Sequence, residues 1–324
     1  ELLNHKTLTR EQARTVLINI ARESYNQSEV VAFLTVFMMR QVTVEELSGF
    51  RDALLELCLR VDLSEFNTID VCGTGGDGKD TFNISTLASF VVAGAGAKVA
   101  KHGNYGVSSS CGSSNVMEYL GYQFTRDVDL LRRQLDQAGI CFFHAPLFHP
   151  AMKAVGSIRR DLGLKTFFNM LGPMVNPSFP QNQLVGVFSL VLARLYNYIY
   201  QQTDKNYTII HSLDGYDEVS LTGNFKAISN GGEQLYGPGD LNLKMVQPEQ
   251  IGGGETVEAS AKIFKAILNG EGTEAQNSVV IANAAMALKC YHPQWDLEQS
   301  LEAAKDSLLS GRAGQVLKKL LENK

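Results

Sequence analysis

The sequence predicts an α/β protein with a small N-terminal all-helical domain, residues 1–66, and a large α/β domain, residues 67–324, whose mostly parallel central sheet is flanked by helices. Three observations predict it. Residues before 66 show only helical apolar spacing. Later, short β-rich runs alternate with helical patterns, as in parallel sheets. With 324 residues, 44% hydrophobic and 19% charged, the chain has a globular composition and the length for two domains.

The helical part contains two N-terminal capping patterns. Thr9 is followed three residues later by Gln12, and Thr43 by Glu46. In each pair the two side chains satisfy backbone N–H groups that the first turn of a helix leaves unpaired. Apolar residues at helical spacing follow both pairs. We therefore expect a helix to begin at each.

A third helical segment, residues 30–39, is apolar on nearly all sides. A helix of this kind must be covered on every side. In so small a domain, a second copy of the chain is one source of cover, which predicts a homodimer through the helical part. Burial under the rest of the same chain is the alternative.

The α/β part shows short strand patterns separated by helical ones. Strands are expected at residues 68–72, 98–100, 140–143, 184–188 and 207–210. Helices are expected at residues 83–93, 115–120, 128–138, 190–200, 255–268, 278–288 and 297–321, the last interrupted at Gly311 and Gly314. Because ligands bind beyond the carboxyl ends of parallel strands, the loops after these strands are the candidate site.

Charge and cysteine content narrow the class of protein. The 29 Lys and Arg against 34 Asp and Glu give a net charge of −5, whereas binding to nucleic acid needs a cationic surface. No apolar run reaches the roughly 20 residues of a membrane span. The 5 cysteines form no C-x-x-C pair, and no secretory pattern is seen at the N-terminus. We expect reduced thiols and a cytoplasmic protein without nucleic-acid or membrane partners.

Four glycines within residues 73–78 follow the first expected strand. Glycine permits positive φ and close approach of backbone N–H groups to an anion. This loop and the N-terminus of the helix near Asn83 therefore predict a phosphate site. Gly78 and Lys79 imitate a P-loop, but Asp80 stands where that loop needs Ser or Thr for Mg²⁺. A tight turn without a ligand is the alternative.

Cations and hydroxyl groups occupy two later segments. Lys101 follows the second strand and offers an ammonium group to phosphate. The hydroxyl groups after it belong to Ser108, Ser109 and Ser113. Arg159 and Arg160 are adjacent on an expected helix and point in different directions, so we expect at most one to face a pocket and the other to be solvated. A guanidinium there would bind a carboxylate bidentately.

Three carboxylates lie within residues 214–218. Such crowding is repulsive unless cations balance it, and oxygen ligands without His or Cys suit Mg²⁺. The adjacent side chains of Asp217 and Glu218 point apart more readily than together, which favours two ions or one ion with a water shell. A solvated acidic turn is the alternative. Together the segments predict a site for a polyphosphorylated substrate, Mg²⁺ and a second, acidic substrate.

Four ordered motifs resemble the anthranilate phosphoribosyltransferase family of tryptophan biosynthesis, in the nucleoside phosphorylase-like superfamily. They are G-T-G-G-D…T-x-N-x-S-T from residue 73, K-H-G-N from residue 101, H-P…R-R-x-L-G…N-x-L-G-P-x-x-N-P from residue 149, and D-G-x-D-E-x-S-x-T-G from residue 214. The resemblance covers nearly the whole chain. It implies displacement of pyrophosphate from phosphoribosyl pyrophosphate by the amine of anthranilate. It also implies a dimer and a segment near residues 150–175 that returns to the helical domain.

The resemblance further implies site residues. The phosphoribosyl pyrophosphate site would be lined by Gly73, Gly76, Asp77, Thr81, Asn83, Ser85, Thr86, Lys101, Asn104, Ser108, Ser109 and Ser113. Anthranilate would contact Gly73, Asn104 and Arg159, and Mg²⁺ would be held by Ser85, Asp217 and Glu218. An aromatic amine is neutral at pH 7, so catalysis needs positioning and neutralisation of the leaving pyrophosphate rather than a strong base. Lys101, Asp217 and Glu218 are the expected catalytic residues.

Three positions depart from the usual family pattern. Tyr105 stands in place of Arg, His144 in place of Phe and Ser212 in place of Gly. A pyrimidine nucleoside phosphorylase-like enzyme is one alternative, but it would carry K-H-S-T-G-G where this chain has V-C-G-T-G-G. A non-catalytic nucleic-acid-binding relative is the other, and it would be basic, with altered metal carboxylates.

Overall fold

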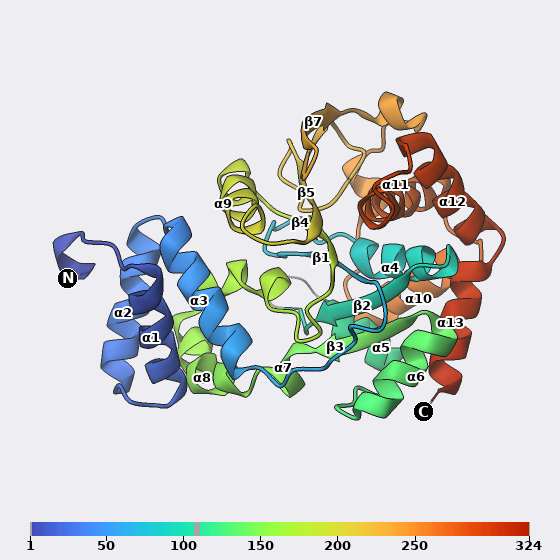
Figure 1. The fold of residues 1–324 in the computed structure, drawn as a ribbon. Helices are drawn as coiled ribbons and strands as arrows, with labels where there is room; N and C mark the ends of the chain where they lie inside the picture. The colour runs from blue at the N-terminus through green and yellow to red at the C-terminus, as the bar shows by residue number, and fades with distance from the viewer. Residues whose placement is uncertain (1, 107–110, 324) are drawn as a thin grey trace.

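The computed structural model describes residues 2–106 and 111–323, which form a helical part beside an α/β part (Figure 1). The helical part contains η1 (Leu2–Asn4), α1 (Arg10–Ala21), α2 (Gln27–Met39) and α3 (Val44–Leu57). The capping boxes expected at Thr9 and Thr43 are both formed, and Asn26 forms a third at the start of α2. Each long helix of this part therefore begins where its own sequence satisfies the first backbone N–H groups.

The core of the helical part includes residues from much later in the chain. α8 (Lys153–Leu162) and η3 (Phe167–Met170) share one hydrophobic cluster with α1, α2 and α3. The rings of Phe50 and Phe167 stack with centroids 4.2 Å apart, and Phe37 meets both edge-on at 5.3 Å. Such aromatic pairs add about 0.5–1.5 kcal/mol each beyond the area they bury.

The chain covers α2 on one side only. Leu34 and Phe37 are buried, whereas Val36 is half-buried, Ala32 is exposed and Met39 is 83% exposed. Neither burial within the same chain nor cover by a second copy therefore accounts for the whole surface of this helix. The same chain buries one face and leaves an apolar strip of the other uncovered.

A seven-stranded sheet forms the centre of the α/β part. Its strands are β1 (Thr68–Gly73), β2 (Lys98–Gly103), β3 (Ile140–His144), β4 (Asn182–Gly186), β5 (Asn206–Ser212), β6 (Phe225–Ser229) and β7 (Gly232–Tyr236). Their order is β3-β2-β1-β4-β5-β6-β7, with the first five parallel and the last two antiparallel. The strand order reverses between β1 and β4, and such a switch point is where open α/β sheets bind ligands.

Helices cover both faces of the sheet. One face packs against α4 (Ile84–Gly94), α5 (Ser113–Tyr119), α10 (Val257–Leu268), α11 (Glu274–Tyr291), α12 (Leu297–Leu309) and α13 (Arg312–Glu322). The other packs against α6 (Val128–Ala138), α7 (Ala145–Phe148), α9 (Leu190–Tyr200) and the helical part. Shorter 3-10 turns are η2 (Pro150–Met152), η4 (Gly172–Met174), η5 (Pro238–Leu241) and η6 (Pro248–Ile251). The expected fold class is confirmed.

Two sequence expectations need revision. The expected strands are all present, with shifted ends, but β6 and β7 were not expected, because β7 is an edge strand with mostly exposed residues and no β-branched side chain. Gly311 separates α12 from α13 as expected, whereas Gly314 lies inside α13 and does not interrupt it. A Cβ at Gly314 would lie 2.7 Å from the carbonyl oxygen of Leu268, so this glycine serves close packing.

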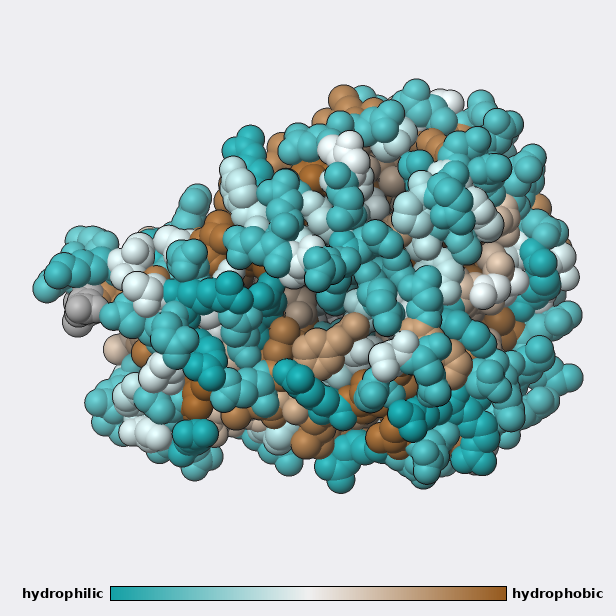
Figure 2. All heavy atoms as spheres, in the orientation of Figure 1, coloured by the Kyte–Doolittle hydropathy of each residue, from teal (hydrophilic) through white to brown (hydrophobic). Residues whose placement is uncertain are grey.

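The face of the molecule shown in Figure 2 is predominantly polar, and apolar residues form separate patches on it. In the described part of the chain, no helix has the length and apolar character that crossing a membrane requires. The five cysteines are free thiols, as expected.

Candidate active site

The glycine-rich loop leaves β1 at the switch point and is anchored there by Asp217. Gly75, Gly76 and Gly78 have φ values of +66°, +76° and +74°, a conformation that glycine adopts without strain. The N–H of Gly75 donates to Asp217 Oδ2 over 2.6 Å. A Cβ at Gly73 would lie 2.4 Å from that same oxygen. The predicted phosphate loop and the predicted metal carboxylate are therefore in contact.

Glu218 points away from Asp217, to the N-terminus of α4. Its Oε1 accepts a hydrogen bond from the N–H of Ser85 over 2.9 Å, and its Oε2 lies 3.5 Å from Thr81 Oγ1. The predicted divergence of the two carboxylates is thus present. The sequence led us to expect a ligand phosphate at this helix N-terminus, but the carboxylate of Glu218 already lies there, where the helix dipole stabilises it.

Burial and mutual repulsion both disfavour the charged forms of Asp217 and Glu218. Burial, followed by the charge of Asp77, raises the pKa of Asp217 above its ordinary value. Burial and the charge of Asp217 likewise raise the pKa of Glu218. Within the described residues, no three His, Cys, Asp or Glu side chains are grouped to hold a metal ion unaided. The donor set fits Mg²⁺, which usually keeps waters and substrate oxygens beside one or two protein carboxylates.

Lys101 lies beneath the carboxylates rather than on the open surface. Its side chain is 1% exposed, and Nζ donates to the carbonyl oxygen of Val71 over 2.6 Å. Burial lowers its pKa, while the charges of Asp70, Cys72 and Glu218 oppose that shift. In this conformation the ammonium offsets negative charge from within the protein.

The loop after β2 brings Asn104 and Ser113 together. The hydroxyl of Ser113 donates to the carbonyl oxygen of Asn104 over 3.3 Å, and the side-chain oxygen of Asn104 accepts from the N–H of Tyr105 over 2.8 Å. Ser108 and Ser109 lie outside the described residues. The remaining predicted donor-site residues are in and after the glycine loop.

Those remaining residues differ in exposure. Asn83 is half-buried and its amide donates to the carbonyl oxygen of Cys111 over 3.0 Å. Gly76 and Asp77 are half-buried in the glycine loop. Thr86 is only 1% exposed and faces the core side of α4, so its side chain is the least accessible of the described set.

Two of the family departures contact each other. The ring of Tyr105 lies edge-on to His144 at 4.7 Å, and its hydroxyl donates to Glu118 Oε1 over 2.8 Å. His144 Nδ1 also lies 2.8 Å from the hydroxyl oxygen of Ser114, and its ring stacks on that of Phe124 with centroids 4.7 Å apart. His144 is therefore a packed polar residue.

Arg159 is the inward-facing member of the arginine pair. It lies half-buried on α8, with its guanidinium carbon 5.2 Å from the ring centroid of Phe168, whereas Arg160 is exposed. Burial lowers the pKa of Arg159. The expectation that the two side chains point to different environments is confirmed.

Two buried histidines near the end of β2 were not selected from the sequence. The rings of His102 and His149 lie 5.3 Å apart, and His102 Nδ1 is 3.1 Å from the carbonyl oxygen of Gly172. His102 Nε2 has no hydrogen-bond partner among the described residues, and His149 interacts with the backbone of Val175. Burial lowers their pKa values to about 4 and about 3, so both rings are neutral at pH 7. The available sequence signal was that both lie within the family motifs, His102 in K-H-G-N and His149 in H-P.

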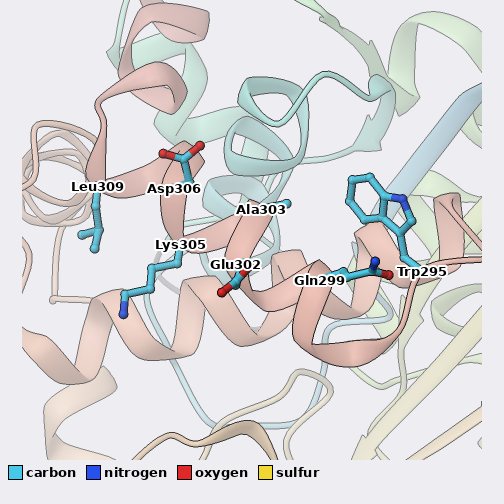
Figure 3. Close-up of a pocket in the computed structure, with 7 residues that line it drawn as sticks. All are labelled: Trp295, Gln299, Glu302, Ala303, Lys305, Asp306 and Leu309. Carbon is cyan, nitrogen blue, oxygen red and sulfur yellow. The ribbon is translucent and has the colours of Figure 1, made fainter.

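A separate open hollow of about 800 Å³ lies on the outer helical layer (Figure 3). Its lining comes from α12 and the turn before it and consists of Trp295, Gln299, Glu302, Ala303, Lys305, Asp306 and Leu309. These side chains have mixed charge and none belongs to the predicted motifs. The switch-point edge of the sheet is therefore the candidate active site.

Family models and curated relatives match nearly the whole chain. A model described as "Glycosyl transferase family, helical bundle domain" matches residues 1–58, and "Glycosyl transferase family, a/b domain" matches residues 65–314. The anthranilate phosphoribosyltransferase of Flavobacterium johnsoniae is 63% identical, over 99% of this chain and 97% of its own. That of Flavobacterium psychrophilum is 62% identical, over 98% and 96%.

Solved structures match the fold as closely. The anthranilate phosphoribosyltransferase of Thermus thermophilus superposes with a TM-score of 0.93 at 28% identity, covering 99% of this chain and 97% of its own. The Saccharomyces cerevisiae enzyme in complex with phosphoribosyl pyrophosphate (PRPP) and Mg superposes with a TM-score of 0.89 at 25% identity, covering 98% and 93%.

Proposed function

Because the chain belongs to the anthranilate phosphoribosyltransferase family, we propose that the switch-point edge of its sheet is the active site of that reaction. The enzyme transfers the phosphoribosyl group of PRPP to the amine of anthranilate, giving N-(5-phosphoribosyl)anthranilate and pyrophosphate, in L-tryptophan biosynthesis. One observation carries the assignment of the site: adjacent carboxylates contact both the glycine loop and the N-terminus of α4. The relatives favour neither a nucleoside phosphorylase nor a nucleic-acid-binding protein.

The donor PRPP would bind over the glycine loop. Backbone N–H groups in a glycine-rich turn suit phosphate oxygens, and the positive φ values of this loop support that use. The described residues assigned to the donor are Gly73, Gly76, Asp77, Thr81, Asn83, Ser85, Thr86, Lys101, Asn104 and Ser113. Ser108 and Ser109 complete the proposed set from outside the described residues.

Mg²⁺ would be held by Asp217, Glu218 and Ser85. The raised pKa values of the two carboxyl groups support a bound cation, because a divalent charge relieves their repulsion. When bound, the ion supplies neutralising charge for the pyrophosphate that leaves. Lys101 adds a fixed positive charge from below.

Anthranilate would bind between the glycine loop and α8. The guanidinium of Arg159 supports recognition of its carboxylate, with Asn104 and Gly73 at the loop side. The neutral rings of His102 and His149 add no competing charge, and His102 Nε2 has no partner among the described residues. The chain thus positions a neutral amine and needs no strong base to activate it.

Loss of anthranilate fluorescence on mixing the protein with PRPP and Mg²⁺ tests the reaction. We expect loss of fluorescence with Mg²⁺ and none with excess chelator.

Asp217→Asn and Glu218→Gln should each lower turnover by about 10²-fold and raise the Mg²⁺ concentration for half-maximal rate. The exposed Asp214→Asn, in the same turn, is the matched control. Unchanged Mg²⁺ dependence in both site variants would remove the metal assignment.

We further propose a cytoplasmic homodimer. The apolar strip of Ala32, Val36 and Met39 supports association through the helical part.

We place the domain boundary near residue 66, with residues 150–175 returning to the helical domain. The hydrophobic cluster that α8 and η3 share with α1, α2 and α3 supports that division.

A further inference from the structure

Lys165 reaches the glycine loop from the helical side of the site. It lies in the connection between α8 and η3, and its Nζ donates to the carbonyl oxygen of Gly76. A Cβ built at Gly76 would lie 3.5 Å from Lys165 Cε, so the side chain runs along the loop. Nζ also lies 5.8 Å from the ring centroid of Phe188, just beyond β4. The Lys165 side chain therefore links the segment between α8 and η3 to the glycine loop of the α/β part.

The backbone of Lys165 is fixed by buried neighbours. Thr166 and Phe167 are 4% and 1% exposed, and the N–H of Thr166 donates to Asn169 Oδ1 over 3.0 Å. Phe167 belongs to the core of the helical part. The side chain of Lys165 is itself exposed. An anchored backbone with an exposed ammonium group can present its charge to a ligand without reorganising the fold.

The carboxylates around the loop would repel a phosphate unless cations balance their charge. Asp77, Asp217 and Glu218 make this edge acidic, and the ammonium of Lys101 is buried beneath it. The partner of Lys165 is a neutral carbonyl, and a phosphate oxygen is a stronger acceptor for an ammonium group. An arriving phosphate on this loop would therefore compete well for the Lys165 side chain.

We propose that Lys165 is a further donor-binding residue, whose ammonium group binds a phosphate oxygen of PRPP and links the helical side of the site to the glycine loop. This rests on the proposed function. No bond is made or broken by Lys165 in this role, so it contributes charge and position only.

The test compares Lys165→Met, which keeps the stem and removes the charge, with Lys165→Arg, which keeps the charge. Lys153→Met is the matched control, because Lys153 is exposed at the start of the same returning segment. Binding of PRPP with Mg²⁺ is measured by calorimetry without anthranilate, and KM is measured for both substrates. Circular dichroism checks that each variant is folded.

We expect Lys165→Met to weaken PRPP binding about tenfold, equivalent to about 1.4 kcal/mol. Its anthranilate KM should stay within about twofold of the wild type, and Lys165→Arg should recover most of the binding. Donor binding within twofold of the wild type, or equal loss in Lys153→Met, would overturn the inference. The wild-type assay separately tests the proposed function, since only the ratio between variants bears on Lys165.

Discussion

Arg159 is a cation held against an aromatic ring, half-buried beside an exposed neighbour of the same type. Because Arg160 is exposed and Arg159 is half-buried, Arg160 serves as the control for substitutions of Arg159. Arg159→Ala should raise the anthranilate KM tenfold or more, because a charge-assisted hydrogen bond is worth about 1.5–3 kcal/mol. The KM for PRPP should change less than about twofold, and Arg160→Ala should change neither. If both constants rise together in steady-state assays, Arg159 supports structure instead of binding the acceptor.

His149 makes the folded protein sensitive to acid. Its pKa is lowered to about 3 in the folded state, against about 6.5 in an unfolded chain. Below pH 6.5 the unfolded chain therefore takes up a proton that the folded state excludes. Stability then falls as pH falls, by about 1.4 kcal/mol per unit for one such group.

His149→Gln should remove that contribution. The free energy of unfolding, measured with urea at pH 7 and pH 5, should fall less in the variant than in the wild type. The exposed His5→Gln serves as the control. An equal fall in all three proteins would show that His149 titrates normally in the folded state.

At the scale of elements, the end of β4 and the turn after β5 are packed without space between them. A Cβ at Gly186 would lie 1.4 Å from the carbonyl oxygen of Asp217. The backbone fixes where a Cβ lies and the oxygen is itself a backbone atom, so no rotamer change relieves the overlap. The position of both carboxylates thus depends on a glycine that lies in none of the four motifs.

Gly186→Ala should displace the turn that carries Asp217 and Glu218. We expect a loss of roughly 1–3 kcal/mol in stability, typical of overpacking, and a weaker response of melting temperature to Mg²⁺. Gly239→Ala is the control, because a Cβ there meets nothing within 4 Å. A Gly186→Ala protein with wild-type stability and Mg²⁺ response would contradict this packing.

Local patterns predicted the elements, whereas long-range contacts fixed how the site is assembled. The capping boxes at Thr9 and Thr43 are readable because they span three residues. The bond between Ser85 and Glu218 joins positions 133 apart, and that between Lys165 and Gly76 joins positions 89 apart. No periodicity encodes such pairs. The motifs contain both residues, but the capping of α4 by Glu218 is a contact between two motifs that neither of them encodes.

For the whole molecule, the exposed strip of α2 bears on assembly. Met39→Glu should place a charge in the proposed interface and shift the mass measured by light scattering from dimer to monomer, because an unpaired buried charge is strongly unfavourable. Gln41→Glu, exposed just beyond the helix, should leave the mass unchanged. A Met39→Glu protein that stays dimeric would place the interface elsewhere.

The stacking of Phe167 on Phe50 has a consequence for synthesis of the chain. The two rings are separated by more than a hundred residues, so α1, α2 and α3 leave the ribosome long before their packing partner exists. At about 5–20 residues per second, that interval lasts about ten seconds. During it, the apolar faces of the first three helices face water or a chaperone, and the N-terminal part of the chain is completed only after half of the protein has been translated.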